Sequence, residues 1–397
     1  MFGDWEQRKL SDVADIIGGG TPNTNNEEYW NGDIDWYSPA EIGEQRYVNG
    51  SRKKITMLGL QKSSAKILPV GTVLFTSRAG IGNTAILKKG GATNQGFQSI
   101  LPKENQLDTY FIYSKTDELK RYGEVTGAGS TFIEVSGKQM EKMPISIPSF
   151  EEQIKIGNFF KQLDDTIALH QEKLEKLKQL KKGYLQVMFP QKGEKVPQLR
   201  FANFSQDWKQ RNLNELMDFS NGINAPKENY GSGRKMISVM DILSTDHLVY
   251  ENILNSVNVS KQTEEKNKVE FGDMIFVRSS EIIEEVGWAK AYLDENYALY
   301  SGFSIRGKRK EKYDPIFVEH SLNGISRKQI ERKAGGSTRF NVSQEVLNSL
   351  LIQTPSFEEQ IKIGTFLKEL DTTTFLQKKK ISILKNIKQE LLKKIFN

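Results

Sequence analysis

The sequence predicts a mixed α+β protein built as two similar halves, each consisting of a front domain followed by one long helix. One observation behind this is a long internal repeat: "SFEEQIKIGNFFKQLDD" at 149–165 recurs as "SFEEQIKIGTFLKELDT" at 356–372. The match continues without a gap, at a constant offset of 207, and 21 of its 41 aligned residues are identical. A second observation is that short strand-like segments separated by glycine-containing turns precede each copy of the repeat, which is typical of mixed domains.

Two shorter matches extend the repeat into the front domains. "GAGSTFIEVS" at 127–136 matches "AGGSTRFNVS" at 334–343, and "DWEQRKL" at 4–10 matches "DWKQRNL" at 207–213. The chain is therefore two related halves, and each half serves as a comparison for the other. We expect a first domain at 1–148, a helix at 149–189, a linker at 190–203, a second domain at 204–355 and a second helix at 356–397.

Both long segments carry the same helix start signal. Ser149 and Ser356 follow prolines, and Glu152 and Glu359 come three residues later. This spacing predicts a capping box, in which the serine hydroxyl and the glutamate carboxylate satisfy backbone amides of the first turn. No proline follows until Pro190 in the first copy, so at 1.5 Å per residue each helix could reach about 60 Å.

Apolar residues spaced alternately by three and four form a seam along both helices. A seam with a seven-residue period packs against another helix, so we expect the two copies to pair as an antiparallel coiled coil. The predicted seam residues are Phe160, Leu163, Ile167, Leu174, Leu177, Leu367, Leu370, Ile381 and Leu384.

Polar residues interrupt this seam at two pairs of equivalent positions. They are His170 with Gln377 and Lys181 with Lys388. Polar seam residues can fix the register of a helix pair, but a locally splayed or solvated seam explains them equally well.

Two glycines, Gly157 and Gly364, also lie inside the helices. Each costs about 1 kcal/mol relative to alanine, so either another backbone approaches closely or the glycine is simply tolerated.

The front domains share an outline but differ in their loops. "GTVLFTSRAGIGNTAIL" at 71–87 and "GDMIFVRSSEIIEEVGWAKAYL" at 272–293 each predict a strand, a loop and a second strand. The loops are rich in Arg, Ser, Thr, Asn and Gln, which are the side chains that contact base edges and phosphates in DNA. The candidate DNA contacts are Thr76, Ser77, Arg78, Asn83, Asn94, Gln95, Ser130 and Thr131 in the first domain, and Arg278, Ser279, Ser280, Ser337, Thr338 and Arg339 in the second.

Composition narrows the classes of function. There is no cysteine, and the three histidines lie far apart in the sequence, so we expect no metal site. The net charge of +6 fits a partner with phosphates but is also common in proteins that bind no nucleic acid. The N-terminus has no secretory pattern and no apolar run is long enough to cross a bilayer, so we expect a cytoplasmic protein.

Several motifs together carry a family resemblance: "IPSFEEQIKIGNFFKQLDDTI", "TPSFEEQIKIGTFLKELDTT", the join "VPQLRFANFSQDWKQRNL", and "GSTF" and "GSTR" before the helices. With these motifs the chain resembles, over essentially its whole length, the specificity subunit of Type I restriction-modification systems. The resemblance implies two target recognition domains, two conserved spacer helices and a bipartite, asymmetric DNA target. It also implies two methyltransferase subunits that modify adenine with S-adenosylmethionine and two restriction subunits that use ATP and Mg²⁺, so that no cofactor and no catalytic site belong to this chain. Unlike the second half, the first has no leader similar to "KVPQLRFANF" at 195–204.

Two other classes of protein remain open from the residues alone. A self-contained DNA-modifying enzyme would need an adenine methyltransferase motif with consecutive prolines, which is missing, or a phosphate-binding loop. The segment "GFSIRGKR" at 302–309 ends in arginine where such a loop needs a hydroxyl residue. Asp33 and Asp35 could hold a metal in principle, although loop acids are more often solvated. A helical adaptor without a DNA role would explain the helices but not the two diverged front domains.

Overall fold

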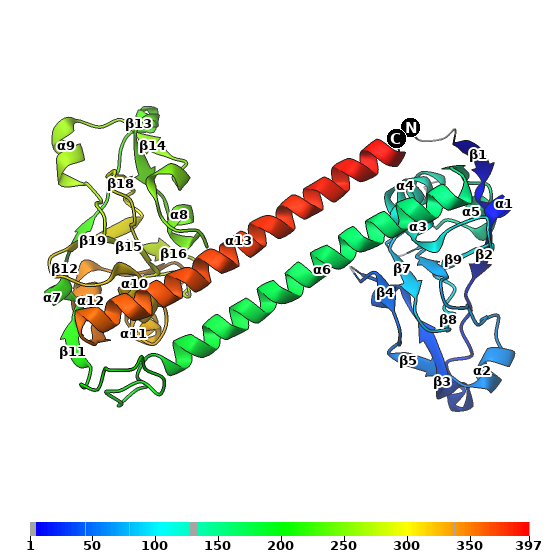
Figure 1. The fold of residues 1–397 in the computed structure, drawn as a ribbon, viewed down its shortest axis with the longest axis horizontal. Coiled ribbons are helices and arrows are strands. Elements are labelled where there is room, and N and C mark those ends of the chain that lie inside the picture. Colours follow the sequence, from blue (N-terminus) through cyan, green and yellow to red (C-terminus); the bar gives the residue numbers. More distant parts are fainter. Residues whose placement is uncertain (1–4, 44, 79, 128–133, 337, 397) are drawn as a thin grey trace. The chain divides into compact units, whose positions relative to one another are not determined.

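The structure, a computed structural model, describes residues 5–43, 45–78, 80–127, 134–336 and 338–396. The chain divides into two compact units. The first unit consists of residues 1–169 and 382–397, and the second of residues 170–381. Each unit therefore contains its own front domain and a part of both long helices, α6 (Phe150–Val187) and α13 (Phe357–Phe396) (Figure 1).

The first unit is built on a five-stranded sheet with the order β2-β9-β6-β7-β4, a three-stranded sheet β5-β3-β8 and the pair β1-β10. Its strands are β1 Glu6–Lys9, β2 Ala14–Gly18, β3 Trp30–Tyr37, β4 Tyr47–Val48, β5 Lys53–Ile55, β6 Val73–Phe75, β7 Thr84–Leu87, β8 Ala92–Thr93, β9 Gln98–Pro102 and β10 Pro144–Ile147. Its short helices are α1 Leu10–Val13, η1 Glu27–Tyr29, η2 Pro39–Glu41, α2 Met57–Gln61, α3 Thr109–Ser114, α4 Thr116–Gly127 and α5 Gly137–Glu141.

The second unit has a four-stranded sheet with the order β12-β19-β15-β17, a three-stranded sheet β14-β13-β18, and the pairs β11-β21 and β16-β20. Its strands are β11 Lys209–Asn212, β12 Met217–Asn221, β13 Tyr230–Ile237, β14 Ser256–Val257, β15 Met274–Val277, β16 Ser279–Ser280, β17 Ala289–Ala291, β18 Leu299–Tyr300, β19 Ser304–Arg309, β20 Phe340–Asn341 and β21 Leu351–Thr354. Its short helices are α7 Leu213–Leu216, η3 Lys227–Asn229, α8 Val239–Leu243, η4 Tyr250–Asn252, α9 Lys261–Lys266, α10 Pro315–Asn323, α11 Arg327–Lys333 and α12 Gln344–Asn348.

The two units have matching topology. The order β2-β9-β6-β7 corresponds to β12-β19-β15-β17, and β5-β3-β8 corresponds to β14-β13-β18, with the β3–β8 and β13–β18 pairs both parallel. The strand registers correspond as well, because Gly18 faces Gln98 as Asn221 faces Ile305. The α+β class and the internal repeat predicted by the sequence are confirmed.

Each long helix begins against a short helix of its own front domain. The side-chain amide of Gln153 donates to the carbonyls of Gln106 and Pro148, and its oxygen accepts from the Asp108 backbone. Gln360 repeats this in the second unit, donating to Pro355 and accepting from the Asp314 backbone. The repeated glutamine therefore joins the start of the long helix to the residue that caps α3 or α10.

The capping box predicted at the helix starts forms only in part. The Ser149 and Ser356 hydroxyls accept from the backbone amides of Glu152 and Glu359, as predicted. The Glu359 carboxylate, however, is fully buried and accepts two hydrogen bonds of 2.8 Å from Arg200 in the linker. A bidentate guanidinium partner is stronger than a single amide, so the carboxylate binds the linker instead.

The two long helices pack antiparallel within each unit. In the first unit the Lys388 ammonium lies 2.7 Å from the Asp164 carboxylate, and in the second Lys181 pairs with Asp371. The lysines that interrupt the seam are thus each paired with an aspartate of the other helix. His170 also has a partner, since the Gln377 side chain donates to its carbonyl at 3.0 Å. These contacts favour register fixing over a solvated seam.

The predicted seam residues all lie on covered faces of the helices. Phe160, Ile167, Leu174, Leu367 and Ile381 are buried, and Leu163, Leu177, Leu370 and Leu384 are half-buried. Phe160 and Leu367 belong to the hydrophobic cores of the first and second unit. The seam therefore continues into the cores of the front domains.

Gly157 and Gly364 lie where a short helix approaches the long one. A Cβ at Gly364 would clash with the carboxylate of Asp314, the N-cap of α10, and a Cβ at Gly157 would clash in the same way with Asp108, the N-cap of α3. Of the two explanations that the sequence left open, close approach is correct. The partner is a capping carboxylate and the amide end of a short helix.

We expect Gly364→Ala to lower the free energy of unfolding by about 1 to 3 kcal/mol, because the added methyl group must displace the N-terminus of α10. Gly183→Ala is the matched control, since a Cβ at this α6 residue would meet nothing within 4 Å. The control should gain up to about 1 kcal/mol from helix propensity. Urea denaturation followed by circular dichroism measures both, and equal effects would contradict the proposed close packing.

Asp371 should make the second unit sensitive to acid. Burial raises the pKa of its carboxyl, but the His320 ring at 2.9 Å and Lys181 outweigh burial and lower the pKa to about 2. A lowered folded-state pKa stabilises the protein above the ordinary value near 3.8, and this contribution is lost as pH falls from about 4 toward 2.

Replacing Asp371 should therefore remove a stabilising interaction of about 2 kcal/mol at neutral pH. We expect Asp371→Asn to lower the denaturation midpoint at pH 7 and to have much less effect near pH 2. The exposed Asp218→Asn is the control for loss of one carboxylate. If Asp371→Asn destabilised the protein equally at both pH values, its effect would come from packing and not from charge.

Candidate nucleic-acid interface

In the second unit three segments meet at one end of the four-stranded sheet. They are the loop after β15, the turn that leads into β19, and the short strand β20. The Arg278 amide donates to the Phe303 carbonyl at 2.9 Å, the Val342 amide donates to the Arg278 carbonyl at 3.0 Å, and β16 pairs with β20. Backbone hydrogen bonds therefore hold these loops together while leaving side chains free to face outward.

The first unit builds the same junction. The Ser77 amide donates to the Gly96 carbonyl at 2.8 Å, and the Val135 amide donates to the Ser77 carbonyl at 3.0 Å. By these contacts Ser77 corresponds to Arg278, and Gly96 corresponds to Phe303. Arg78 is then the counterpart of Ser279, so the arginines of the two loops occupy different positions.

Two of the residues predicted to contact DNA in the first domain are fully buried. The Thr76 hydroxyl lies inside the turn, where it donates to the Gly80 carbonyl at 2.7 Å and accepts from the Asn83 amide at 2.9 Å. Ser77 is also completely covered. Both side chains are inaccessible to a ligand at the surface, so the predicted DNA contact does not fit the burial of Thr76 and Ser77.

The other described candidates of this domain reach the surface. Arg78 and Asn94 are half-buried, and Asn83 and Gln95 are exposed. Arg78 lies across Gly96, since a Cβ there would come within 3.4 Å of its Nε. The Asn94 side chain accepts from the Gly96 amide at 2.8 Å, and Gln95 accepts from the Thr21 hydroxyl. Ser130 and Thr131 lie outside the described residues.

In the second domain one side-chain hydrogen bond joins two of the predicted residues, and the others have different partners or none shown. The exposed Arg339 donates from Nε to the Ser279 hydroxyl at 2.8 Å. Arg278 and Ser280 are half-buried: Arg278 donates to the Gly302 carbonyl at 3.3 Å, and Ser280 donates to the Glu285 carboxylate. Thr338 is exposed and Ser337 lies outside the described residues.

The sequence prediction missed Phe303. Its side chain is 55% exposed, which is unusual for an aromatic residue, and the Arg339 guanidinium carbon lies 5.8 Å from its ring centroid. Phe303 was missed because it is part of an apolar strand pattern. Aligning "SGF" with "QGF" would not have found it either. That alignment matches the two glycines with each other, whereas the hydrogen-bonded strands match Gly96 with Phe303, one residue further on.

The carboxylates and the glycine-rich segment considered as enzyme features have other roles. Asp35 is buried and accepts from Lys89 at 2.9 Å and from the Ser51 amide at 3.1 Å. Burial raises the pKa of this carboxyl, but the hydrogen bonds from Lys89 and Ser51 outweigh it and lower the pKa. Asp33 is exposed. The segment at 302–309 contains the strand β19, so it does not form a phosphate-binding loop.

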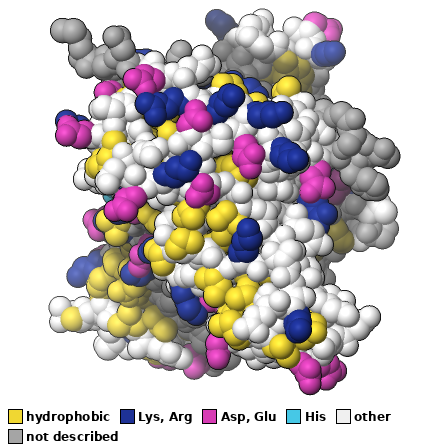
Figure 2. All heavy atoms as spheres, turned by 90° about the vertical axis from the view of Figure 1, so that its right-hand side faces the viewer, with side chains coloured by type: hydrophobic (Ala, Val, Ile, Leu, Met, Phe, Trp, Pro, Cys, Tyr) yellow, Lys and Arg dark blue, Asp and Glu magenta, His cyan; other side chains and the backbone are white. Residues whose placement is uncertain are grey.

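The described residues contain no group of three His, Asp or Glu side chains that could hold a metal ion. Nor does any described helix have the length and apolar character required to cross a membrane. On the face of the first unit drawn in Figure 2, basic and acidic side chains are interspersed, with hydrophobic patches between them. The sign of the charge therefore does not mark that face as a nucleic-acid surface.

Comparisons with known proteins agree on one family. The sequence profile described as the Type I restriction modification DNA specificity domain matches residues 3–179 and 205–386, which is most of the chain. The Type I restriction enzyme MjaIX specificity subunit of Methanocaldococcus jannaschii is 35% identical over 233 residues, covering 56% of this chain and 54% of the relative. The EcoR124I/EcoR124II specificity subunit of Escherichia coli is 29% identical over 170 residues, 41% of each chain. In these two matches the chain spans about half the length of the relative or less.

Solved structures share the fold over the full length. The S subunit of the Type-I restriction-modification system from M. genitalium aligns with a TM-score of 0.65 and 17% identity, covering 99% of this chain and 96% of the other. A second chain, from work on complex assembly and conformational transition of the type I R-M system, aligns with a TM-score of 0.54 and 17% identity. With the duplicated domain matched twice by the family profile, the chain belongs to the family of Type I restriction modification DNA specificity domains.

Proposed function

We propose that this chain is the specificity subunit of a Type I restriction-modification complex. In this proposal each unit binds one part of a bipartite, asymmetric duplex DNA target. The observation that carries it is the loop junction that both units build with the same backbone hydrogen bonds and different side chains. A common scaffold with two sets of loops is what reading two different half-sites requires.

The exposed side chains of the two junctions suit different base chemistry. Arg78 lies across Gly96 in the first unit, so its guanidinium is available to a guanine edge or a phosphate. In the second unit Phe303 occupies the position of Gly96 and offers an apolar face beside the Arg339 guanidinium. An apolar side chain of this kind suits the methyl group of thymine. The two half-sites are therefore expected to differ in sequence.

The chemistry of modification and cleavage is assigned to partner subunits. Two methyltransferase subunits would supply S-adenosylmethionine and modify adenine, and two restriction subunits would use ATP and Mg²⁺ to translocate and cut DNA. The chain itself would contribute no catalytic site and no cofactor, and would act in the cytoplasm as the scaffold that both kinds of subunit share. This assignment rests on family membership.

Mapping of modified bases in DNA from the host tests the proposal directly. We expect methyladenine at a split motif whose two parts have unlike sequences, with one modified adenine on each strand. Deleting the gene for this chain should abolish the pattern. A pattern that persisted after deletion, or a single palindromic motif, would contradict the proposed role.

Single substitutions should separate the two readers. Arg78→Ala should weaken discrimination in one half-site, and Arg339→Ala in the other, each by about 1 to 3 kcal/mol. Competition binding of the complex with the modification subunit, using targets altered in one half at a time, measures this. Each variant is the control for the other. If both variants weakened binding equally for every target, the arginines would contact phosphates and would not read sequence.

A further inference from the structure

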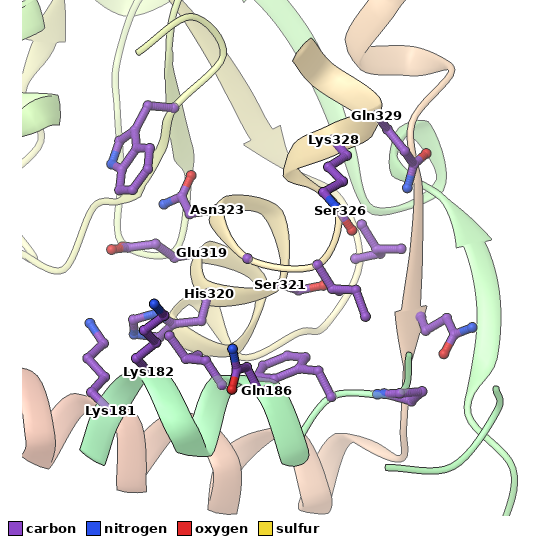
Figure 3. A pocket seen from close by; sticks show the side chains of 18 of the residues that line it. Lys181, Lys182, Gln186, Glu319, His320, Ser321, Asn323, Ser326, Lys328 and Gln329 are labelled. Carbon is purple, nitrogen blue, oxygen red and sulfur yellow. The ribbon is translucent and has the colours of Figure 1, made fainter. Parts of the chain in front are cut away.

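The second unit contains a cavity of about 1180 Å³ that the DNA-reading loops do not use. Its walls come from the C-terminal part of α6 and the linker after it, from α10, α11 and β21, and from α13. Figure 3 shows Lys181 and Lys182 pointing from α6 toward His320 on α10, with Ser326 and Lys328 at the opposite side. All of these residues belong to the second unit.

Comparison with the first unit shows that one side chain of the cavity wall differs between the two units. In the first unit the Lys115 ammonium lies 4.7 to 5.8 Å from the ring centroids of Phe396, Trp5 and Phe111. The second unit repeats the aromatic trio as Phe189, Trp208 and Phe317, with centroid distances of 5.4 to 5.9 Å.

Ser321 stands where the first unit has its lysine. It follows Phe317 by four residues, as Lys115, the C-cap of α3, follows Phe111, so the two positions correspond. The Ser321 hydroxyl and the Trp208 indole N–H are buried in the cavity wall and have no hydrogen-bond partner among the described residues. The short serine side chain thus replaces the long lysine side chain, and the cavity wall there contains two polar groups without a hydrogen-bond partner in the described part of the chain.

The charges around the cavity are strongly unbalanced. Eight of its lining residues are Lys or Arg and two are acidic. Both acids already have partners in the second unit: Asp371 binds Lys181 and His320, while Glu319 accepts from the Ala291 amide at 2.8 Å and lies 3.7 Å from Lys290.

Five of the cations form no ion pair with any described residue. They lie on four different segments, namely α6, the linker, α11 and α13, and are Lys182, Lys192, Lys328, Arg332 and Lys378. Four of them are exposed and Lys378 is half-buried. An anionic occupant would supply these cations with partners of opposite charge.

The walls between these cations decide which kind of anion fits. Leu185, Trp288, Phe375 and Ile325 line the same cavity, so apolar surface lies inside a basic rim. Protein interfaces have this arrangement, with an apolar centre and a polar edge. The volume exceeds the roughly 300 to 1,000 Å³ of small-molecule pockets, and no single small anion could reach cations on four segments. A DNA duplex is too wide to enter.

We propose that this cavity is a docking site for an acidic polypeptide segment of a partner protein, whose apolar side chains enter the cavity while its carboxylates pair with the basic rim. The proposal does not depend on the DNA-reading role of the loops. Its first consequence is a salt-sensitive interaction, because rim charges act through screened electrostatics.

A fluorescein-labelled peptide of alternating glutamate and leucine is the probe, and a peptide with lysine in place of glutamate is its control. Fluorescence anisotropy with the full chain should show binding of the acidic peptide alone. The double variant Lys182→Glu with Lys328→Glu should weaken this binding at least about tenfold. The matched control, Lys173→Glu with Lys379→Glu, changes the same total charge at exposed residues of α6 and α13 that do not line the cavity, and should leave binding nearly unchanged.

Each other outcome would overturn the proposal. Equal binding of both peptides, no binding of the acidic one, or equal loss in the two double variants would show that the rim does not select acidic segments. Displacement of the peptide by ATP or inorganic phosphate at similar concentration would mark a small-anion pocket. Displacement by duplex DNA, together with weaker DNA binding of the Lys182→Glu and Lys328→Glu variant alone, would assign the rim to the DNA surface.

Discussion

The close approach of a short helix to a glycine of a long helix is the contact on which each unit depends. In the second unit α10 begins at Asp314, whose carboxylate caps the helix and lies against Gly364. Because α10 starts there, Phe317 reaches the hydrophobic core and His320 reaches Asp371. Gln360 fixes the same junction by accepting from the Asp314 amide. A larger residue at Gly364 would displace all of these contacts together.

The contacts between the two long helices also explain why the repeat contains polar residues at equivalent positions. Asp164 with Lys388 and Asp371 with Lys181 are one ion pair formed twice, once in each unit. A charged pair between two helices constrains their register more than apolar contacts do, because a shift of one turn would leave both charges partly buried and unpaired. The free-energy cost of leaving one charge unpaired, rather than the attraction between the two charges, specifies the register of the helices.

Divergence between the halves is concentrated where it does not affect this scaffold. At the loop junction the backbone hydrogen bonds are the same, while Gly96 in one unit becomes Phe303 in the other. Lys115 at the C-cap of α3 corresponds to Ser321 inside α10, which lies in the wall of a cavity. The first change gives the two proposed DNA-binding junctions different surfaces. The second leaves buried polar groups in the cavity wall without a partner among the described residues.

The duplication, the two long helices and the α+β class could be predicted from the amino-acid sequence alone, because these depend on local periodicity and on similarity between distant segments. The sequence also identified Gly157, Gly364 and the polar seam residues as positions that need an explanation. It could not choose among the explanations, because the contacts that decide between them form only in the folded chain. There Lys181 pairs with Asp371, and Gly364 lies against Asp314.

The loops that we propose to bind DNA also show what residue type alone cannot predict. Among the polar loop residues, Arg339 is exposed and Arg78 is half-buried, yet Thr76 and Ser77, which are equally polar, are buried inside their turn. Phe303 has the composition of a core residue but is exposed. Whether a loop side chain faces solvent depends on strand register and on backbone hydrogen bonds to other loops. The tertiary structure therefore decided which loop residues are available to a ligand, because burial is set by neighbours that are distant in the sequence.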